Sequence, residues 1–143
     1  MRFHSKDIDK IVVHHSASPR NTTLEQIREW HVEQNGWDAI GYHFVITGDG
    51  MIHMTRPTRF MGAHCRGKND GSLGICLTGN NTVEEDQWDG AQIISLHSLV
   101  RSLRVVFNYP EVYGHRDLNE GTECPGRDVQ PWFSGPIYER RTR

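Results

Sequence analysis

Strand-like and helix-like hydrophobic patterns alternate along the chain. Apolar residues dominate IVVHH (11–15) and SLGICLTG (72–79), which indicates short buried strands, the second apolar enough for the centre of a sheet. The segment IGYHFVITGDGMIHMTR (40–56) alternates apolar and polar residues around Gly48-Asp49-Gly50, a pattern typical of a β-hairpin. PEVYGH (110–115) predicts a final short strand that, like the first, ends in histidine.

Two segments have the periodicity of amphipathic helices. In NTTLEQIREWHVEQNG (21–36), Thr22 or Thr23 caps the start of the helix and a glycine ends it. QWDGAQIISLHSLVRSLRVVF (87–107) predicts a longer helix, and the tail from Pro131 favours one short helix. The apolar faces consist of Leu24, Ile27 and Trp30 in the first helix and of Ile93, Leu96, Val100, Leu103 and Phe107 in the second.

This alternation predicts an α/β fold in which a central mixed β-sheet is flanked by α-helices. A length of 143 residues suits a single domain, 1–143, with one core. Because parallel strands end at the same edge of a sheet, His14 and His115 are expected at that edge, where α/β proteins commonly build their sites.

Charge and composition exclude several classes of protein. The net charge is −2, from 16 basic and 18 acidic residues, so no nucleic-acid partner is expected. No apolar run approaches the roughly 18 residues of a membrane span. The start, MRFHSKDIDK, lacks the apolar core of a secretion signal, so we expect cytoplasmic synthesis without a signal peptide. The three cysteines are then expected to be reduced thiols.

The spacing of three residues predicts a metal site. His115 and Cys124 are nine positions apart, and the polar segment RDLNEGTE between them is long enough to fold both ends onto one ion. With His14 from the first strand, the set has two imidazoles and one thiolate. This set suits Zn²⁺ with three protein ligands and an open fourth position for water.

Two other interpretations fit the same residues. In one, His14 is a core histidine, His115 caps its strand and Cys124 is a buried thiol. In the other, Cys124 is a nucleophile activated by His115, which leaves His14 without a role.

Four stretches of the chain occur together in one known family. They are IVVHHSA, GWDAIGYHFVITGDGMI, GAHCRGKNDGSLGICLTGN and GHRDLNEGTECPG. In this order and spacing they resemble the type 2 N-acetylmuramoyl-L-alanine amidases, a family that includes small phage lysozyme-amidases and the peptidoglycan recognition proteins. The resemblance covers about residues 9–130, nearly the whole chain.

The resemblance implies a ligand set. Matched position by position, the zinc ligands are His14, His115 and Cys124, the same three residues that the spacing indicates, with one Zn²⁺ per chain. His15 is not a ligand position in the family, and we expect it to point away from the metal because neighbouring residues of a strand face opposite sides.

The resemblance also implies which residues surround the metal. Tyr42 matches the tyrosine that the family places beside the zinc, where its phenol would hydrogen-bond the attacking water or the oxyanion. Where phage members often have a lysine, this chain has Thr122, which offers a hydroxyl but no charge. His64 matches a histidine near the substrate cleft. On the same loop, Arg66 and Asn69 are candidates for binding stem-peptide carboxylates or sugar hydroxyls.

These features predict a zinc-dependent amidase that cuts the bond between the lactyl group of muramic acid and L-alanine in bacterial peptidoglycan. Its small size, without a separate wall-binding domain, suggests a monomeric phage endolysin that is made in the host cytoplasm and acts at the cell wall, with no membrane partner. Two alternatives are a non-catalytic peptidoglycan-recognition module and a cytoplasmic amidase that recycles muropeptides. The recycling enzymes typically have an aspartate in place of Cys124. A third alternative is an enzyme that also binds a protein partner.

Overall fold

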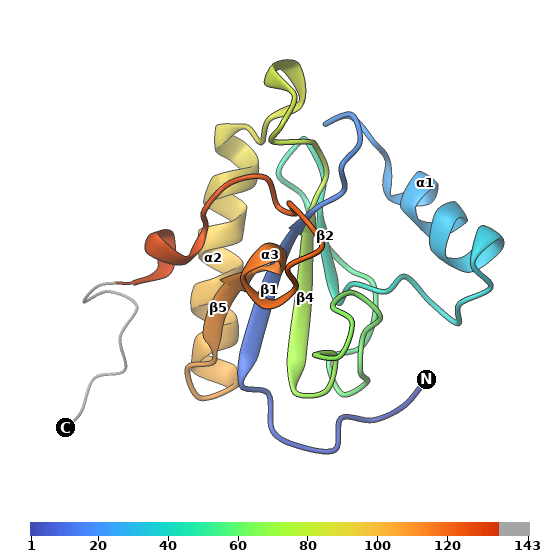
Figure 1. Ribbon diagram of the computed structural model, residues 1–143, viewed down its shortest axis with the longest axis vertical. Helices are drawn as coiled ribbons and strands as arrows, with labels where there is room; N and C mark the ends of the chain where they lie inside the picture. Colours follow the sequence, from blue (N-terminus) through green and yellow to red (C-terminus); the bar gives the residue numbers. More distant parts are fainter. Residues whose placement is uncertain (135–143) are drawn as a thin grey trace.

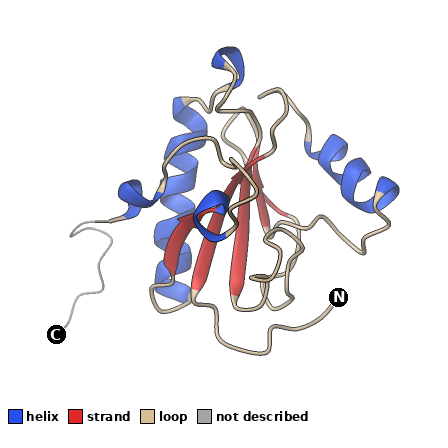
Figure 2. Ribbon diagram, viewed as in Figure 1, coloured by secondary structure: helices blue, strands red, loops and turns tan. Residues whose placement is uncertain are grey.

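The structure is a computed structural model that describes residues 1–134 of the 143. Five strands form one sheet in the order β3-β2-β4-β1-β5, with helices on both sides of it (Figures 1 and 2). The strands are β1 (Lys10–His15), β2 (Phe44–Ile46), β3 (Ile52–Met54), β4 (Ser72–Leu77) and β5 (Glu111–Gly114). The helices are α1 (Leu24–Arg28), α2 (Gly90–Val106) and α3 (His115–Leu118), with a π-helical turn at Glu29–Gln34 and 3₁₀ turns at Glu84–Asp86 and Gln130–Phe133.

The sheet is mixed, which confirms the predicted α/β fold. β1 pairs in parallel with β4 and β5, β2 pairs in parallel with β4, and β3 is antiparallel to β2. β4 is the central strand and all of its residues are buried, as its apolar sequence predicts. The predicted hairpin joins β2 to β3, and its turn is closed by a hydrogen bond of 2.8 Å from Gly50 N to Thr47 O.

The main core lies between the sheet and α2. Leu96, Val100 and Leu103 of α2 are buried against Ile11 and Val13 of β1 and their neighbours. Burial of this apolar area is the main stabilising contribution, since each fully buried aliphatic side chain is worth about 1.5–3 kcal/mol.

A smaller cluster occupies the opposite face of the sheet. It joins Ile27 of α1 to Val45 and Cys76 of the sheet. In the parallel register, His14 lies beside Cys76, and Cys76 lies beside Val45. His14 therefore emerges on the α1 side of the sheet, away from α2, while His15 belongs to the other face.

The predicted helix at 21–36 is present, but it is not a uniform α-helix. Thr23 caps its start, as expected, and a π-helical turn at Glu29–Gln34 follows α1. A π turn adds a residue and changes which side chains face the protein. Trp30, expected on the apolar face, is instead 37% exposed. His31 turns inward, and its Nδ1 accepts a hydrogen bond from Gly41 N at 3.0 Å.

The polar segment between His115 and Cys124, in which the sequence predicts no helix, begins with the short helix α3. The helix starts at once because Asp117 Oδ2 accepts a hydrogen bond from Gly114 N at 2.7 Å. The short helix expected from Pro131 is a 3₁₀ turn at Gln130–Phe133, and the rest of that tail, 135–143, lies outside the described residues.

A capping box begins α2 and ties it to the sheet. Asp89 Oδ1 accepts a hydrogen bond from Gln92 N at 2.9 Å, and Gln92 Oε1 accepts one from Asp89 N at 3.2 Å. The buried Gln92 amide also donates to Thr78 O at 2.8 Å, just beyond β4. Among the described residues, no helix is both long and apolar enough to cross a membrane.

Replacing the cap of α2 tests this arrangement. Asp89→Ala leaves the N–H of Gln92 without its acceptor and should lower the free energy of unfolding by about 1 kcal/mol. Asp89→Asn keeps a side-chain acceptor and loses only an exposed ion pair with Arg20 at 3.7 Å, so it should remain close to the parent protein. Urea unfolding of the three proteins measures the difference, and equal losses for both variants would contradict the capping role.

Candidate metal centre and its cleft

Two histidines meet where β1 and β5 end side by side. Val13 of β1 pairs with Gly114 of β5, so the next residues, His14 and His115, are neighbours at the carboxyl edge of the sheet. Their ring centroids are 4.6 Å apart. His14 is 2% exposed, whereas His115, at the start of α3, is partly exposed.

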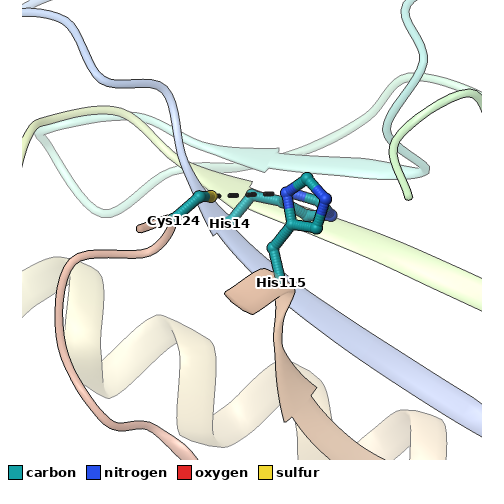
Figure 3. Close-up of side chains that lie close together, drawn as sticks. All are labelled: His14, His115 and Cys124. Atoms are coloured by element: carbon teal, nitrogen blue, oxygen red, sulfur yellow. Dashed lines mark hydrogen bonds between the residues drawn. The ribbon is translucent and has the colours of Figure 1, made fainter. Parts of the chain in front are cut away.

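The segment after α3 brings Cys124 to the same place. Cys124 O accepts a hydrogen bond from Arg116 N at 2.6 Å, and its Sγ accepts one from His15 N at 3.3 Å. Cys124 N donates to Thr122 Oγ1 at 3.1 Å, which fixes the turn before the cysteine. As a result the thiol points along the end of β1 toward His14 (Figure 3).

The three side chains form a compact donor group. One ligand atom from each of His14, His115 and Cys124 lies within 4.8 Å of the others. The Sγ of Cys124 is 3.7 Å from Nδ1 of His14, so this nitrogen faces the group (Figure 3). Two imidazoles and a thiol at these separations match the nitrogen and sulfur ligands that Zn²⁺ takes in proteins.

Burial sets the protonation of these groups in the metal-free protein. Desolvation lowers the pKa of His14 well below its usual value and lowers that of His115, so both imidazoles are neutral near pH 7 and have a free lone pair. Burial raises the pKa of the Cys124 thiol to about 12. A cation that binds here must therefore displace the thiol proton.

This environment argues against the cysteine-nucleophile interpretation. A nucleophilic cysteine needs a lowered pKa, and the pKa of Cys124 is shifted in the opposite direction. The convergence of three donors also argues against three unrelated packing roles, because that interpretation gives no reason for the donor atoms to meet.

A cleft of about 520 Å³ opens beside the donor group. Tyr42 lines it, and the ring of Tyr42 lies 5.1 Å from that of His14, centroid to centroid. Desolvation raises the pKa of the Tyr42 phenol well above its usual value, so it stays protonated and able to donate a hydrogen bond. The lining residues are His14, His31, Trp37, Tyr42, Ala63, His64, Cys65, Arg66, Asn69, His115 and Cys124.

The loop that carries His64, Arg66 and Asn69 forms one wall of this cleft. Asn69 Oδ1 accepts hydrogen bonds from the backbone N–H groups of His64 and Cys65, both at 3.0 Å, so its amide holds the loop together. Arg66 is exposed at the rim. His64 is buried, and its Nδ1 lies 2.9 Å from Nε2 of His14.

Thr122 and His15 occupy supporting positions. The hydroxyl oxygen of Thr122 is the acceptor for Cys124 N, and Thr122 is not among the residues that line the cleft. His15 is buried on the opposite face of β1 from His14, as expected, and its Nδ1 accepts a hydrogen bond from Asn81 N at 3.2 Å.

The sequence interpretation missed two aromatic residues of the cleft. His31 and Trp37 were not among the predicted site residues. Their rings are in tilted contact with centroids 4.7 Å apart, and the ring of His31 lies 5.4 Å from that of Tyr42. Trp37 follows directly after the predicted helix, and helix periodicity does not specify how the chain folds back beyond the end of a helix.

A larger hollow of about 940 Å³ lies elsewhere, between the start of α1, the β2–β3 turn and the turn before α2. Two of its carboxylates accept hydrogen bonds from the backbone. Asp86 Oδ1 accepts one from Arg20 N at 3.1 Å, and Asp49 Oδ1 accepts one from Met51 N at 3.0 Å. These bonds stabilise turns, so the cleft beside His14 is the better candidate for chemistry.

The fold and the site together define a class: α/β proteins with two histidines and a cysteine converging at the carboxyl edge of a mixed sheet, beside an open cleft. Within that class, the chain belongs to the N-acetylmuramoyl-L-alanine amidase family (Amidase_2), which it matches over residues 4–127. The sequence prediction of this family is confirmed.

Phage, insect and bacterial proteins are similar to the chain. It is 33% identical over 133 residues to the endolysin of Klebsiella phage KP32, covering 90% of this chain and 87% of the endolysin. It is 35% identical over 128 residues to peptidoglycan-recognition protein SC2 of Drosophila melanogaster, covering 82% and 68%. The solved N-acetylmuramoyl-L-alanine amidase LysC of Clostridium intestinale URNW superposes with a TM-score of 0.76 at 34% identity, covering 90% and 86%.

The buried histidine next to Tyr42 predicts a pH dependence of stability. His43 Nε2 donates to Phe60 O at 2.7 Å and its Nδ1 accepts from Gly74 N at 3.0 Å, so the ring is held in its neutral form. Burial lowers the pKa of His43 from 6.5 to about 4. Below pH 6.5 the unfolded chain takes up this proton and the folded chain does not, so stability is complete above pH 6.5 and falls toward pH 4, by about 3 kcal/mol in total.

Urea unfolding of the metal-free protein at several pH values between 7 and 4 measures this loss. His43→Gln should have a lower free energy of unfolding at pH 7. With acidification this free energy should fall less steeply than in the parent protein, because up to one proton fewer is taken up on unfolding. An unchanged slope in the variant would show that His43 does not contribute to the acid sensitivity.

Proposed function

We propose that the chain is a Zn²⁺-dependent N-acetylmuramoyl-L-alanine amidase with one ion per chain. It hydrolyses the amide bond between the lactyl group of N-acetylmuramic acid and L-alanine in bacterial peptidoglycan. The observation that carries the proposal is the convergence of His14, His115 and Cys124 beside a cleft, in a chain that belongs to this family.

The donor group fits zinc. His14 and His115 are neutral and present nitrogen lone pairs, and Cys124 supplies a sulfur ligand once its proton is displaced. Bound at this position, Zn²⁺ supplies Lewis-acid chemistry, which polarises a carbonyl and lowers the pKa of water.

Tyr42 is the main candidate for stabilising the charge that develops on the carbonyl oxygen. Its phenol is desolvated and protonated, and its ring lies 5.1 Å from that of His14. In this structure the phenol interacts with the Cys76 thiol, and a protonated phenol that turns toward the cleft can donate a hydrogen bond to a developing oxyanion. Thr122 does not line the cleft, and its oxygen accepts the N–H of Cys124, so we assign it to holding the turn that carries the sulfur ligand.

The walls of the cleft suit a muramyl peptide. The tilted rings of His31 and Trp37 offer aromatic contacts to the apolar faces of the sugar and the lactyl group. At the rim, the exposed guanidinium of Arg66 is placed to pair with a carboxylate of the stem peptide. Asn69 also lines the cleft, and it binds substrate only through its amide nitrogen, because its oxygen accepts two backbone N–H groups.

Its biological role is that of a phage endolysin, made in the host cytoplasm and acting at the cell wall. This role is supported by the similarity to phage endolysins over most of both chains. The similarity to peptidoglycan-recognition protein SC2 supports a second candidate, a module that binds peptidoglycan without cutting it. The full donor set and the protonated Tyr42 favour the enzyme.

The proposal predicts metal-dependent release of new N-terminal L-alanine from purified peptidoglycan. We expect release by the purified protein, loss of release after treatment with a chelator, and recovery with one equivalent of zinc. His14→Ala should bind no zinc tightly and release no L-alanine. His53→Ala is the matched control, because this histidine lies on β3 away from the cleft and is expected to retain activity.

Each outcome separates the candidates. Tight binding of peptidoglycan without cleavage, despite one bound zinc, would favour the recognition module. Faster cleavage of soluble muropeptides than of intact wall would favour a recycling amidase over an endolysin. Full activity of His14→Ala would contradict the zinc mechanism.

A second prediction concerns the phenol. Tyr42→Phe keeps the ring and removes only the donor, so it should fold normally, bind zinc with unchanged affinity and lose about 100- to 1,000-fold in kcat. Steady-state kinetics with a soluble muramyl peptide measure this loss. A change confined to KM would instead assign Tyr42 to substrate binding.

A further inference from the structure

The two ring nitrogens of His14 have different neighbours. Nδ1 faces the donor group and is 3.7 Å from Cys124 Sγ, whereas Nε2 is 2.9 Å from Nδ1 of His64. Both rings are buried, and their planes are nearly perpendicular, at 89°. His64 is thus in contact with the side of His14 that points away from the metal position.

We propose that His64 is a positioning residue for the metal, acting through His14. Its Nδ1 accepts the Nε2–H of His14, which holds His14 in the tautomer whose Nδ1 lone pair faces His115 and Cys124. The inference rests on the proposed zinc site.

The argument follows from the chemistry of a neutral imidazole, which has one N–H and one lone pair. If His14 carried its proton on Nδ1, that proton would occupy the position of the metal. A hydrogen-bond acceptor at Nε2 removes this tautomer, and partners of this kind typically change metal affinity by about 10- to 100-fold.

The surroundings of His64 hold its ring in one place. A Cβ atom at Gly74 would lie 2.6 Å from Cγ of His64, and one at Gly62 would lie 2.6 Å from Cδ2, so both glycines are needed for the ring to fit. The amide of Asn69 anchors the backbone of His64 at 3.0 Å. A rigidly placed acceptor is what an oriented metal ligand requires.

A packing role alone does not explain why residue 64 is a histidine. Nε2 of His64 is buried and has no hydrogen-bond partner among the described residues, which is unfavourable for folding compared with an apolar ring of similar size. The contact with His14 gives a reason for a histidine. It also means that Nδ1 of His64 is occupied, in contrast to the substrate-binding role expected from the sequence.

Zinc affinity, measured by competition with a chromophoric chelator, tests the proposal. His64→Phe keeps a flat ring but has no acceptor, and we expect it to bind zinc about 10- to 100-fold more weakly than the parent protein. His64→Asn places an oxygen close to the position of Nδ1 and should recover most of the affinity. Amidase activity of His64→Phe should return at saturating zinc, whereas a substrate-contact role would raise KM and leave zinc affinity unchanged.

Nitrogen-15 NMR of the zinc-loaded parent protein gives a second test that does not depend on the folding of a variant. We expect His14 to carry its proton on Nε2 and His64 to be unprotonated at Nδ1. Unchanged zinc affinity in a folded His64→Phe, or a proton on Nδ1 of His64, would overturn the positioning role. Failure of the parent protein to bind zinc would instead overturn the proposed metal site itself.

Discussion

The parallel pairing of β1 with β5 is the constraint on which the site depends. It places residues from opposite ends of the chain in one register, so that His14 and His115 follow Val13 and Gly114 at the same edge. The main-chain N–H of His15 then donates a hydrogen bond to the sulfur of Cys124, which adds the third member of the donor group. A one-residue slip of β1 would exchange His14 for His15 and direct the wrong imidazole to the cleft.

The two faces of the sheet differ in how completely they are covered. The face against α2 is apolar and supplies most of the burial, whereas the other face is covered only partly, by α1 and its π turn. This incomplete cover leaves room for the cleft. The π turn directs His31 rather than Trp30 toward the protein, and so adds an aromatic wall that a regular helix would not provide.

Much of the fold could be predicted from the sequence because strand and helix periodicities are local signals. The hairpin, the central strand and the helix at Gly90–Val106 all follow from patterns within about 20 residues. Contacts between loops have no such signal. The contact of His14 with His64, fifty positions apart, and the tilted contact of Trp37 with His31 depend on how the loops fold over the sheet, which periodicity does not specify. The π turn was missed for a related reason, because it breaks the period that the prediction assumes.

The origin of the donors has a consequence for the whole chain. His14 and Cys124 are 110 positions apart, so an ion held by both would act as a reversible cross-link that closes most of the polypeptide into a loop. Ligand that binds only the folded state raises the free energy of unfolding in proportion to the logarithm of its concentration. Metal supply would then govern how long the protein survives heat and proteases, independently of whether any substrate is present.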